Sequence, residues 1–283
     1  VLFGLLPAVR GSRVPLADTL KSGARSVTGA PDRGGRLPLG KILIAGQMAF
    51  AILLLVVAAL FARCLEATMR VEVGYDRDRL LLARIDPRSA GYALTDLPAL
   101  HRRLLQRLAD VPGVTAASAS SSGPFSGSAN RGDFEIDGYV RRTDERLVAN
   151  YEWVTDDYFR TVGLALTRGR GFLPQDAVTG RRVSVINETM ARRYFPNQNP
   201  LGRRWGRSRD FDRFGFEIVG VVEDARYNDV TAADVSMAYI PSTLGERYLR
   251  SVEIRAAGSP ALLVNAVRSA LRDVEPRLPP GAI

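Results

Sequence analysis

Cysteine and histidine are almost missing from this chain of 283 residues, which contains one of each. Cys64 cannot form a disulfide within the chain, and an extracytoplasmic domain without disulfides points toward a bacterial protein. A zinc site is nearly excluded, because such a site draws on several of these side chains. A Ser/His/Asp triad would have to be built on His101, which follows Leu100 in the pattern of an amphipathic helix. We expect His101 to occupy a surface position on that helix.

Clustered acidic residues are also scarce. No run of Asp and Asn has the spacing of a calcium-binding loop, although a calcium site built from separate carboxylates stays open. The best acidic pair is Asp156–Asp157, which helix capping explains. Residues 35–41 match most of a phosphate-binding loop, but Ile42 stands where Ser or Thr would hold Mg²⁺ and Pro38 interrupts the loop. We therefore expect no catalytic, cofactor or metal site.

The formal net charge is +9, mostly from Arg, and no long basic run concentrates it. Nucleic-acid binding is disfavoured for that reason. A basic balance also suits a protein that lies next to anionic lipid, and we prefer that interpretation. Hydrophobic residues make up 46% of the chain, which is enough for a sizeable core in one large or two small domains.

The longest apolar run is Ile42–Phe61, ILIAGQMAFAILLLVVAALF, which carries no charge. As a helix, a segment of about 20 residues reaches about 30 Å, the thickness of a hydrocarbon core. Lys41 and Arg63 stand at its two ends, where basic side chains can reach lipid headgroups. A buried helix of a soluble protein seldom stays uncharged for so long. We predict a transmembrane helix over residues 42–62.

The segment before this helix is basic, with seven Lys or Arg against two Asp between Arg10 and Lys41. Short basic loops beside a span stay in the cytoplasm, so we place residues 1–41 inside and residues 63–283 outside the membrane. A flexible Gly- and Pro-rich linker ends this segment. The opening VLFGLLPAV is interpreted as the end of an earlier membrane helix, and the chain as a fragment. A signal peptide fits poorly, because its hydrophobic core would be too short.

Two strand–helix patterns lie near the ends of the outer part of the chain. The first is a strand, a helix and a strand at Leu80–Asp86, Leu97–Asp110 and Val114–Ala119. The second is a strand at Ser251–Arg255 and a helix from Ser259, its N-cap, to about Asp273. The fold class we expect is α+β. Two β-α-β halves, about residues 78–120 and 245–283, flank a β-rich insertion at about residues 131–244.

The insertion is expected to be mostly β with short helices. Strands are expected at Asp133–Ile136, Leu147–Val154, Val183–Ile186, Phe216–Val222 and Met237–Ile240, with a turn at Asp137–Gly138 joining the first two. Thr155 is a candidate cap for a helical turn over residues 156–162. Asn187 is expected to cap a helix over Glu188–Tyr194 that Pro196 ends. Ser118–Asn130, rich in Ser and Gly, is expected to be a mobile loop.

Three further patterns are weak signals. Asn187-Glu-Thr is formally a glycosylation sequon, but a helix cap explains Asn187 better. Arg131-Gly-Asp133 matches an adhesion tripeptide that arises easily by chance. Many arginines make the insertion basic, and a solvated face is favoured over a lipid-binding or partner-binding surface. These arginines are Arg168, Arg170, Arg181, Arg182, Arg192, Arg193, Arg203, Arg204, Arg207 and Arg209.

An ordered series of short motifs runs along the chain after the apolar helix. Its members are VTDDYFRTVG (154–163), RGRGF (168–172), VSVINE (183–188), ARRYFP (191–196), NPLG (199–202), IVGVVED (218–224) and YIP (239–241). In this order they resemble the periplasmic core domain of MacB/FtsX-type ABC transporter permeases. The series is specific as a whole, although no single piece is, and it covers most of the chain from the apolar helix onward. The opening FGLLPAVRGSR (3–13) resembles the cytoplasmic exit of the last helix of such a permease.

The resemblance implies a permease subunit of a bacterial inner-membrane ABC transporter for export or efflux, with porter-like β-α-β halves in its periplasmic domain. It implies mechanotransmission, in which cytoplasmic ATP hydrolysis changes how two periplasmic domains face each other. The duplicated-permease type fits best. In MacB an ATPase domain precedes this helix, whereas here we expect the ATPase to be a separate chain. The implied partners are a separate ABC ATPase, a second permease half or a homodimer partner, a periplasmic adaptor and membrane lipid.

Two other classes of protein compete with this hypothesis. The main alternative is a membrane-anchored extracytoplasmic sensor that binds a ligand and signals inward. Further spans beyond residue 283 would favour a transporter, whereas one returning span and a cytoplasmic output domain would favour the sensor. An anchored envelope hydrolase is disfavoured, because the residues offer no catalytic set.

Overall fold

The computed structural model describes residues 39–69, 73–127, 130–207, 215–227, 235–245 and 247–278. The chain divides into two compact units, Val1–Glu66 and Ala67–Ile283. The second unit is called the folded domain below. The cytoplasmic segment is predicted over residues 1–41, and residues 1–38 of it, including residues 35–38 of the phosphate-loop match, lie outside the described residues.

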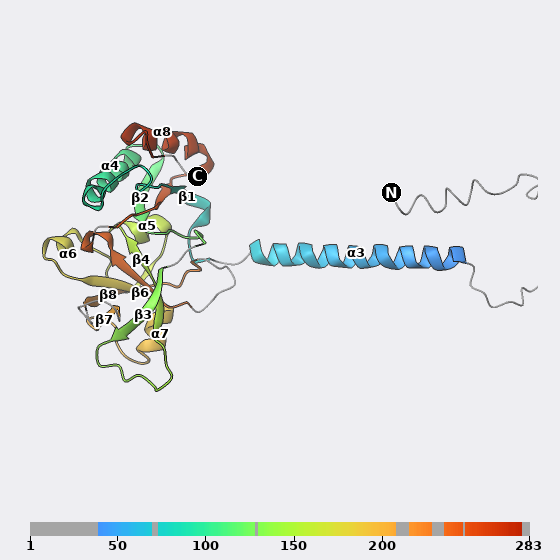
Figure 1. Ribbon diagram of the computed structural model, residues 1–283, viewed down its shortest axis with the longest axis horizontal. Coiled ribbons are helices and arrows are strands. Elements are labelled where there is room, and N and C mark those ends of the chain that lie inside the picture. The colour runs from blue at the N-terminus through green and yellow to red at the C-terminus, as the bar shows by residue number, and fades with distance from the viewer. Residues whose placement is uncertain are drawn as a thin grey trace, which may run out of the picture. The chain divides into compact units, whose positions relative to one another are not determined.

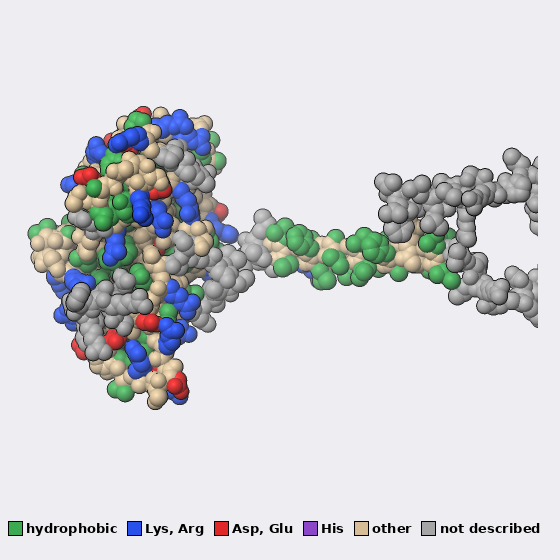
Figure 2. Space-filling model, in the orientation of Figure 1, with side chains coloured by type: hydrophobic (Ala, Val, Ile, Leu, Met, Phe, Trp, Pro, Cys, Tyr) green, Lys and Arg blue, Asp and Glu red, His purple; other side chains and the backbone are tan. Residues whose placement is uncertain are grey.

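The first described element is helix α3, Leu39–Met69 (Figure 1). The helix predicted over Ile42–Phe61 is therefore confirmed, and in the structure it continues past Arg63 to Met69. Ile42–Glu66 is long and apolar enough to cross a membrane, and its described side chains are exposed. Figure 2 shows apolar side chains along most of its length on the face in view. A helix that is apolar all round has no polar face for water, which favours lipid as its surroundings.

The folded domain contains ten strands within the described residues. They are β1 (Leu80–Arg84), β2 (Val114–Ser120), β3 (Asn130–Ile136), β4 (Val148–Val154), β5 (Leu166–Gly169), β6 (Val183–Asn187), β7 (Arg204–Arg207), β8 (Phe216–Val222), β9 (Met237–Pro241) and β10 (Ser251–Ala256). The accompanying helices are α4 (Leu97–Ala109), α5 (Tyr158–Val162), α6 (Pro174–Val178), α7 (Glu188–Tyr194) and α8 (Val264–Val274). The fold is mixed α and β, as predicted.

One layer of the domain contains β1, β10 and β2, in that order and antiparallel. Helices α4 and α8 lie side by side against it (Figure 1). Leu100, Leu104 and Leu108 form the buried face of α4, and Val267 and Leu271 form that of α8. Because β10 lies between β1 and β2, the two predicted β-α-β halves share one sheet in space. We call this part the α/β layer.

The remaining strands form a closed ring. β4, β3, β7, β8, β6 and β9 pair in sequence, and β9 pairs back to β4, while β5 adds to β8. Buried aromatic side chains pack in it, with Phe134 edge-on to Trp205 at 5.9 Å between ring centroids. The indole N–H of Trp205 donates to Ser184 Oγ at 2.7 Å. The ring is joined to the α/β layer where Ser120 of β2 pairs with Val154 of β4.

Several local predictions differ from the structure. Thr155 does not cap α5: its hydroxyl accepts the N–H of Ala119 at 3.0 Å, so it ties β2 to the chain leaving β4. Ser259 precedes a 3₁₀ turn, Pro260–Leu263, and its side chain makes no capping bond. The turn at Asp137–Gly138 exists, but a longer connection than this turn separates β3 from β4. β5, β7 and α6 were not predicted, because short, arginine-rich or Pro-led segments give weak periodicity.

Candidate functional site

The motifs that carry the family resemblance come together where β6 leads into α7. Asn187 is the N-cap of α7, as predicted, and its side-chain oxygen accepts the backbone N–H of Met190 at 3.0 Å. The same oxygen accepts the N–H of Met237 on β9 at 2.9 Å. Its amide group donates to Asp224 at 2.7 Å and to the carbonyl of Val235 at 2.8 Å. One buried side chain thus holds together α7, β9 and the end of β8.

Asp224 completes this network at the first turn of α7. Its carboxylate accepts the backbone N–H of Thr189 at 2.8 Å and the hydroxyl of Thr189 at 2.9 Å. Arg192 donates to it at 2.7 Å. A carboxylate at a helix N-terminus meets free N–H groups and the positive end of the helix dipole. The negative charge of Asp224 is therefore balanced by hydrogen-bond donors, and the network holds α7 against β8 and β9.

The glycines of the motifs mark a close backbone crossing between β5 and β8. A Cβ at Gly169 would approach the carbonyl oxygen of Val219 more closely than the 3.0 Å that real Cβ atoms keep. A Cβ at Gly220 would meet the carbonyl oxygen of Arg170 in the same way. Gly169 also has φ of +70°, which favours glycine. These motif residues are explained by close packing of the backbone.

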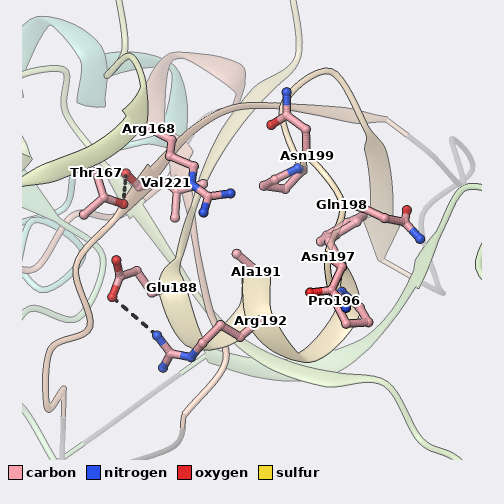
Figure 3. A pocket seen from close by; sticks show the side chains of 12 residues that line it. Thr167, Arg168, Glu188, Ala191, Arg192, Pro196, Asn197, Gln198, Asn199 and Val221 are labelled. Atoms are coloured by element: carbon pink, nitrogen blue, oxygen red, sulfur yellow. Dashed lines mark hydrogen bonds and ion pairs between the residues drawn. The ribbon is translucent and has the colours of Figure 1, made fainter.

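A polar groove of about 600 Å³ lies beside this crossing (Figure 3). In the figure, Glu188 and Arg192 extend from α7 on one side, and Arg168 and Asn199 lie across the opening. Glu188 and Arg192 are ion-paired at 3.4 Å. The groove offers amides and a guanidinium for hydrogen bonding. Among its described lining residues, the hydroxyl of Thr167 donates to the carbonyl of Val221 at 3.3 Å, and no hydrogen bond described there joins a nucleophile to a base.

Two acidic side chains are completely buried where the α/β layer meets the ring. Glu253 of β10 accepts the hydroxyl of Ser118 at 3.0 Å and that of Ser120 at 2.6 Å. Glu152 of β4 accepts the hydroxyl of Ser121 at 2.9 Å and that of Tyr227. We call Glu152, Glu253 and their hydroxyl partners the buried acid cluster. None of the hydrogen bonds described for these two carboxylates comes from Lys or Arg.

Burial dominates the titration of both acids. It raises the pKa of Glu253 to about 7, and the hydroxyls of Ser120, Ser251 and Ser118 oppose that rise while Glu152 adds to it. Burial also raises the pKa of Glu152, against hydrogen bonds from Tyr227 and its neighbours. A buried carboxyl without a cation favours its neutral form. The hydroxyls of Tyr75 and Tyr158 are buried nearby without a hydrogen-bond partner.

His101 is not at the surface, contrary to our prediction. Only 8% of the side chain is exposed, because α4 turns it toward the segment that contains Leu249. Burial lowers the pKa of His101 to about 4, and a hydrogen bond to the backbone of Leu249 opposes that shift. The ring is neutral at physiological pH. Its Nε2 has no hydrogen-bond partner, so the bond to Leu249 assigns the proton to Nδ1.

The predicted acidic pair lies just before α5. Asp157 is the N-cap by position but makes no side-chain capping bond, and it pairs with Arg160 at 3.1 Å. Burial raises the pKa of Asp156, and the charge of Asp157 adds to the rise. The prediction that Asp156 and Asp157 serve as helix caps is therefore wrong. Asp156 and His101 instead line the same groove, which the sequence did not indicate.

The remaining sequence signals are not assembled into a site. Cys64 lies exposed on α3. Arg131–Asp133 belongs to β3 and pairs with β4, and Asp133 is ion-paired with Arg146 at 2.9 Å. Asn187 of the formal sequon is 2% exposed and occupied by its four hydrogen bonds. Within the described residues, no group of three or more His, Cys, Asp or Glu is arranged to hold a metal ion.

Several arginines of the insertion have specific partners rather than forming a plain solvated face. Arg170 makes a two-pronged ion pair with Asp176, with both separations at 2.7 Å, and this lowers the pKa of Asp176. Arg181 pairs with Glu217 at 3.0 Å. Arg182 lies 4.7 Å from the ring centroid of Phe216. Arg209 lies outside the described residues.

Sequence reasoning missed the buried acid cluster entirely. A signal existed, because Glu152 interrupts the apolar run of β4 and Glu253 interrupts that of β10. An acidic residue inside a strand that is otherwise buried demands a partner or a shifted pKa. The pairing of β4, β2 and β10 that brings the two together is non-local, and no pattern within either strand predicts it.

Comparison with known proteins identifies the group to which the chain is similar. A family model described as the MacB-like periplasmic core domain matches residues 42–274. The ABC transporter permease YknZ of Bacillus subtilis (strain 168) is 27% identical over 146 residues, which cover 48% of this chain and 34% of YknZ. The macrolide export ATP-binding/permease protein MacB of Aggregatibacter actinomycetemcomitans is 33% identical over 76 residues, which cover 27% of this chain and 11% of MacB.

Solved structures of the same kind were also found. The periplasmic region of MacB from Actinobacillus actinomycetemcomitans matches with a TM-score of 0.48 and 16% identity, covering 74% of this chain and 89% of that one. The extracellular domain of YknZ from Gram-positive bacteria matches with a TM-score of 0.43 and 20% identity, covering 69% of this chain and 92% of that one.

Proposed function

Since the chain belongs to the MacB-like periplasmic core domain family, we propose that it is part of a permease subunit of a bacterial ABC transporter. The observation that carries this proposal is the family match over residues 42–274, which covers most of α3 and most of the folded domain. We assign the folded domain to the extracytoplasmic side of the inner membrane and residues 1–41 to the cytoplasm. The process served is export or efflux.

The proposed mechanism is mechanotransmission. ATP binding and hydrolysis in the cytoplasm move the membrane helices, α3 among them, and the folded domain changes how it faces a second such domain. The α/β layer acts as two interlocked porter-like halves, with the β-rich ring as their insertion. The Asn187–Asp224 network and the backbone crossing at Gly220 support this mechanism, because an element that transmits motion has to be stiff.

The proposed role is not enzymatic, and it requires partners. ATP hydrolysis belongs to a separate ABC ATPase subunit, near which the basic segment before α3 would lie. A second permease half or a second copy supplies the facing domain. A periplasmic adaptor and membrane lipid complete the set, and no cofactor or nucleic acid is involved.

Co-purification tests the proposal. The full-length protein that contains this chain is solubilised in detergent from its native membrane, isolated by an affinity tag and assayed for ATP hydrolysis. A stoichiometric ATPase subunit is the expected companion. If no ATPase co-purifies, and if the intact protein has one returning span and a cytoplasmic output domain, the sensor alternative replaces the transporter.

The single cysteine allows a matched test of orientation. In a Cys64→Ser background, Val178→Cys places a thiol at a position that is 88% exposed in the folded domain, and Ser22→Cys places one before α3. A maleimide that cannot cross membranes should label the first in intact spheroplasts and the second only after lysis. The opposite pattern contradicts the proposed orientation.

A further inference from the structure

The chain enters the folded domain at Val73, the first residue that the structure describes after α3. We call residues 73–76 the arm. Residues 70–72 join α3 to the arm, so a pull that α3 exerts along the chain enters the folded domain at the arm. The contacts that hold the arm therefore decide whether the domain follows α3.

The ring holds the first half of the arm through the chain that leaves β8. The carbonyl of Val73 accepts the backbone N–H of Arg226 at 2.9 Å. Gly74 has φ of +80°, and a Cβ there would lie 2.5 Å from the carbonyl oxygen of Asp224, closer than real Cβ atoms come. The backbone of the arm is thus pressed against Asp224, whose side chain belongs to the network around Asn187.

The side chain of Tyr75 anchors the middle of the arm. It is 6% exposed and lies in one apolar cluster with Tyr158 and Val162 of α5. Its ring is edge-on to that of Phe125, with the centroids 5.9 Å apart. A buried aromatic side chain removes a large apolar area from water. Pulling the arm away from the domain would expose that area, so Tyr75 resists it.

The end of the arm is held by α5 and by β10 of the α/β layer. The N–H of Asp76 donates to the carbonyl of Val162 at 3.2 Å. Its carboxylate forms an ion pair with Arg255 of β10, whose guanidinium also donates to the carbonyl of Thr161 at 3.3 Å. The side chains of Asp76 and Arg255 are 33% and 22% exposed, so water screens this pair less than a pair at the surface.

Gly163 leaves the space in which this ion pair lies. It has φ of +81°, and a Cβ there would lie 2.9 Å from the Cβ of Asp76 and 3.0 Å from Nη1 of Arg255. Only glycine combines this backbone conformation with so close an approach. Two of the motifs that carry the family resemblance therefore end against the arm, one at Gly163 and one at Asp224.

From these contacts we propose that the arm is the joint that passes the movement of α3 to the folded domain, and that the Asp76–Arg255 ion pair keeps it in place. We call Gly163, Asp224, Arg226 and Arg255 the arm seat. Because the seat draws on both the ring and the α/β layer, a seated arm moves the two together. An arm released from it behaves as a flexible linker, which transmits no orientation. This inference rests on the proposed function, because it requires α3 to move.

Hydrogen exchange tests the arm seat without the ATPase, on the full-length protein in nanodiscs. Arg255→Asp replaces an attraction by a repulsion, so peptides that cover residues 73–79 should exchange about tenfold faster. Asp76→Asn, a milder variant of the same size, should shift exchange in the same direction. Adding Asp76→Arg to Arg255→Asp should restore slow exchange in part. The matched control is Arg141→Asp, at an exposed position between β3 and β4, which should change nothing.

Double electron–electron resonance then tests transmission, with the ATPase present and trapped by vanadate. One spin label is placed at Val178→Cys, which is 88% exposed, and one in the domain that faces it, in a Cys64→Ser background. Trapping should shift the distance between the facing domains when the arm is unaltered. Arg255→Asp should lose most of that shift, and adding Asp76→Arg should recover part of it. Unchanged exchange in peptides of β6 shows that the domain of each variant is folded.

The outcomes separate this inference from the proposed function. If Asp76→Asn and Arg255→Asp both leave exchange at residues 73–79 unchanged, the arm seat is overturned. A shift as large in Arg255→Asp as in the unaltered protein overturns its role in transmission, while the proposed function stands. If the unaltered protein shows no shift although exchange behaves as expected, the proposed mechanism fails and this inference fails with it. Should Arg255→Asp unfold the domain, Asp76→Asn decides by the same two measurements.

Discussion

The buried acid cluster makes the stability of the folded domain depend on pH in a direction opposite to that of an acid paired with a cation, such as Asp176, whose pKa is lowered. The pKa of Glu253 rises from 4.5 to about 7 on folding, chiefly because of burial. Between these two values the folded state holds a proton that the unfolded state has released. The contribution of Glu253 to the free energy of unfolding is therefore complete below pH 4.5 and is lost as the pH rises to about 7.

A difference of about 2.5 pKa units corresponds to about 3 kcal/mol, at 1.36 kcal/mol for each unit. Glu253→Gln mimics the protonated acid and keeps the capacity to bond to the serine hydroxyls. The variant and the unaltered chain should have similar free energies of unfolding at pH 4.5. At pH 8 the variant should be more stable by about 3 kcal/mol, because its side chain cannot ionise.

Urea unfolding in detergent, followed by tryptophan fluorescence between pH 4.5 and pH 8.5, measures this difference. The two tryptophans of the chain, Trp153 and Trp205, both lie in the folded domain, so the signal reports on that domain alone. Ser120→Ala is a companion variant: it removes a hydrogen bond that lowers the pKa of Glu253, so the loss of stability should move to higher pH. A stability difference between Glu253→Gln and the unaltered chain that stays constant across the pH range would refute the reasoning.

Other predictions address packing, capping and the membrane helix. Asn187→Ala should lower the free energy of unfolding by about 3 kcal/mol through a lost cap and unsatisfied buried groups, and Asn187→Asp should destabilise more at neutral than at acidic pH because it faces Asp224. Gly220→Ala should prevent the folded domain from folding, so that the protein loses its resistance to protease. Gly258→Ala, whose added Cβ would meet open space, should change the free energy of unfolding by no more than about 0.5 kcal/mol. Leu54→Arg, at the centre of α3, should cost about 3 kcal/mol of insertion and reduce the fraction that resists carbonate extraction.

The elements with strong local patterns were predictable. α3 and α4 follow from an uncharged run and from an apolar face at Leu100, Leu104 and Leu108, and the Asn187 cap follows from its place before a helical pattern. Each depends on residues close in sequence, where periodicity and capping chemistry decide the structure.

The non-local arrangement was not predictable from the same patterns. In the sequence β10 follows the insertion, but in the sheet it lies between β1 and β2. That position is decided by pairing between segments that are far apart in the sequence. The burial of His101 follows from that arrangement, because residues around Leu249 cover α4. Thr155 was predicted to cap a nearby helix, but its hydroxyl instead accepts the N–H of Ala119 on β2. In each case a tertiary contact replaced the local one.

The central claim is that ATP hydrolysis in the cytoplasm moves the folded domain relative to the domain it faces. Double electron–electron resonance spectroscopy on the full-length protein, reconstituted with its ATPase in nanodiscs, measures this motion most directly. If the facing domain belongs to a second copy, a spin label at Val178→Cys in a Cys64→Ser background reports the distance between facing domains. If it belongs to the second permease half, a second label is placed in that half. A pair at Val178→Cys and Leu262→Cys, which are 88% and 83% exposed, reports the distance within one domain when only one copy carries the labels. The account predicts that trapping the ATPase with vanadate shifts the distance between domains and leaves the distance within one domain unchanged. A distance between domains that is the same in the nucleotide-free and trapped states would contradict it.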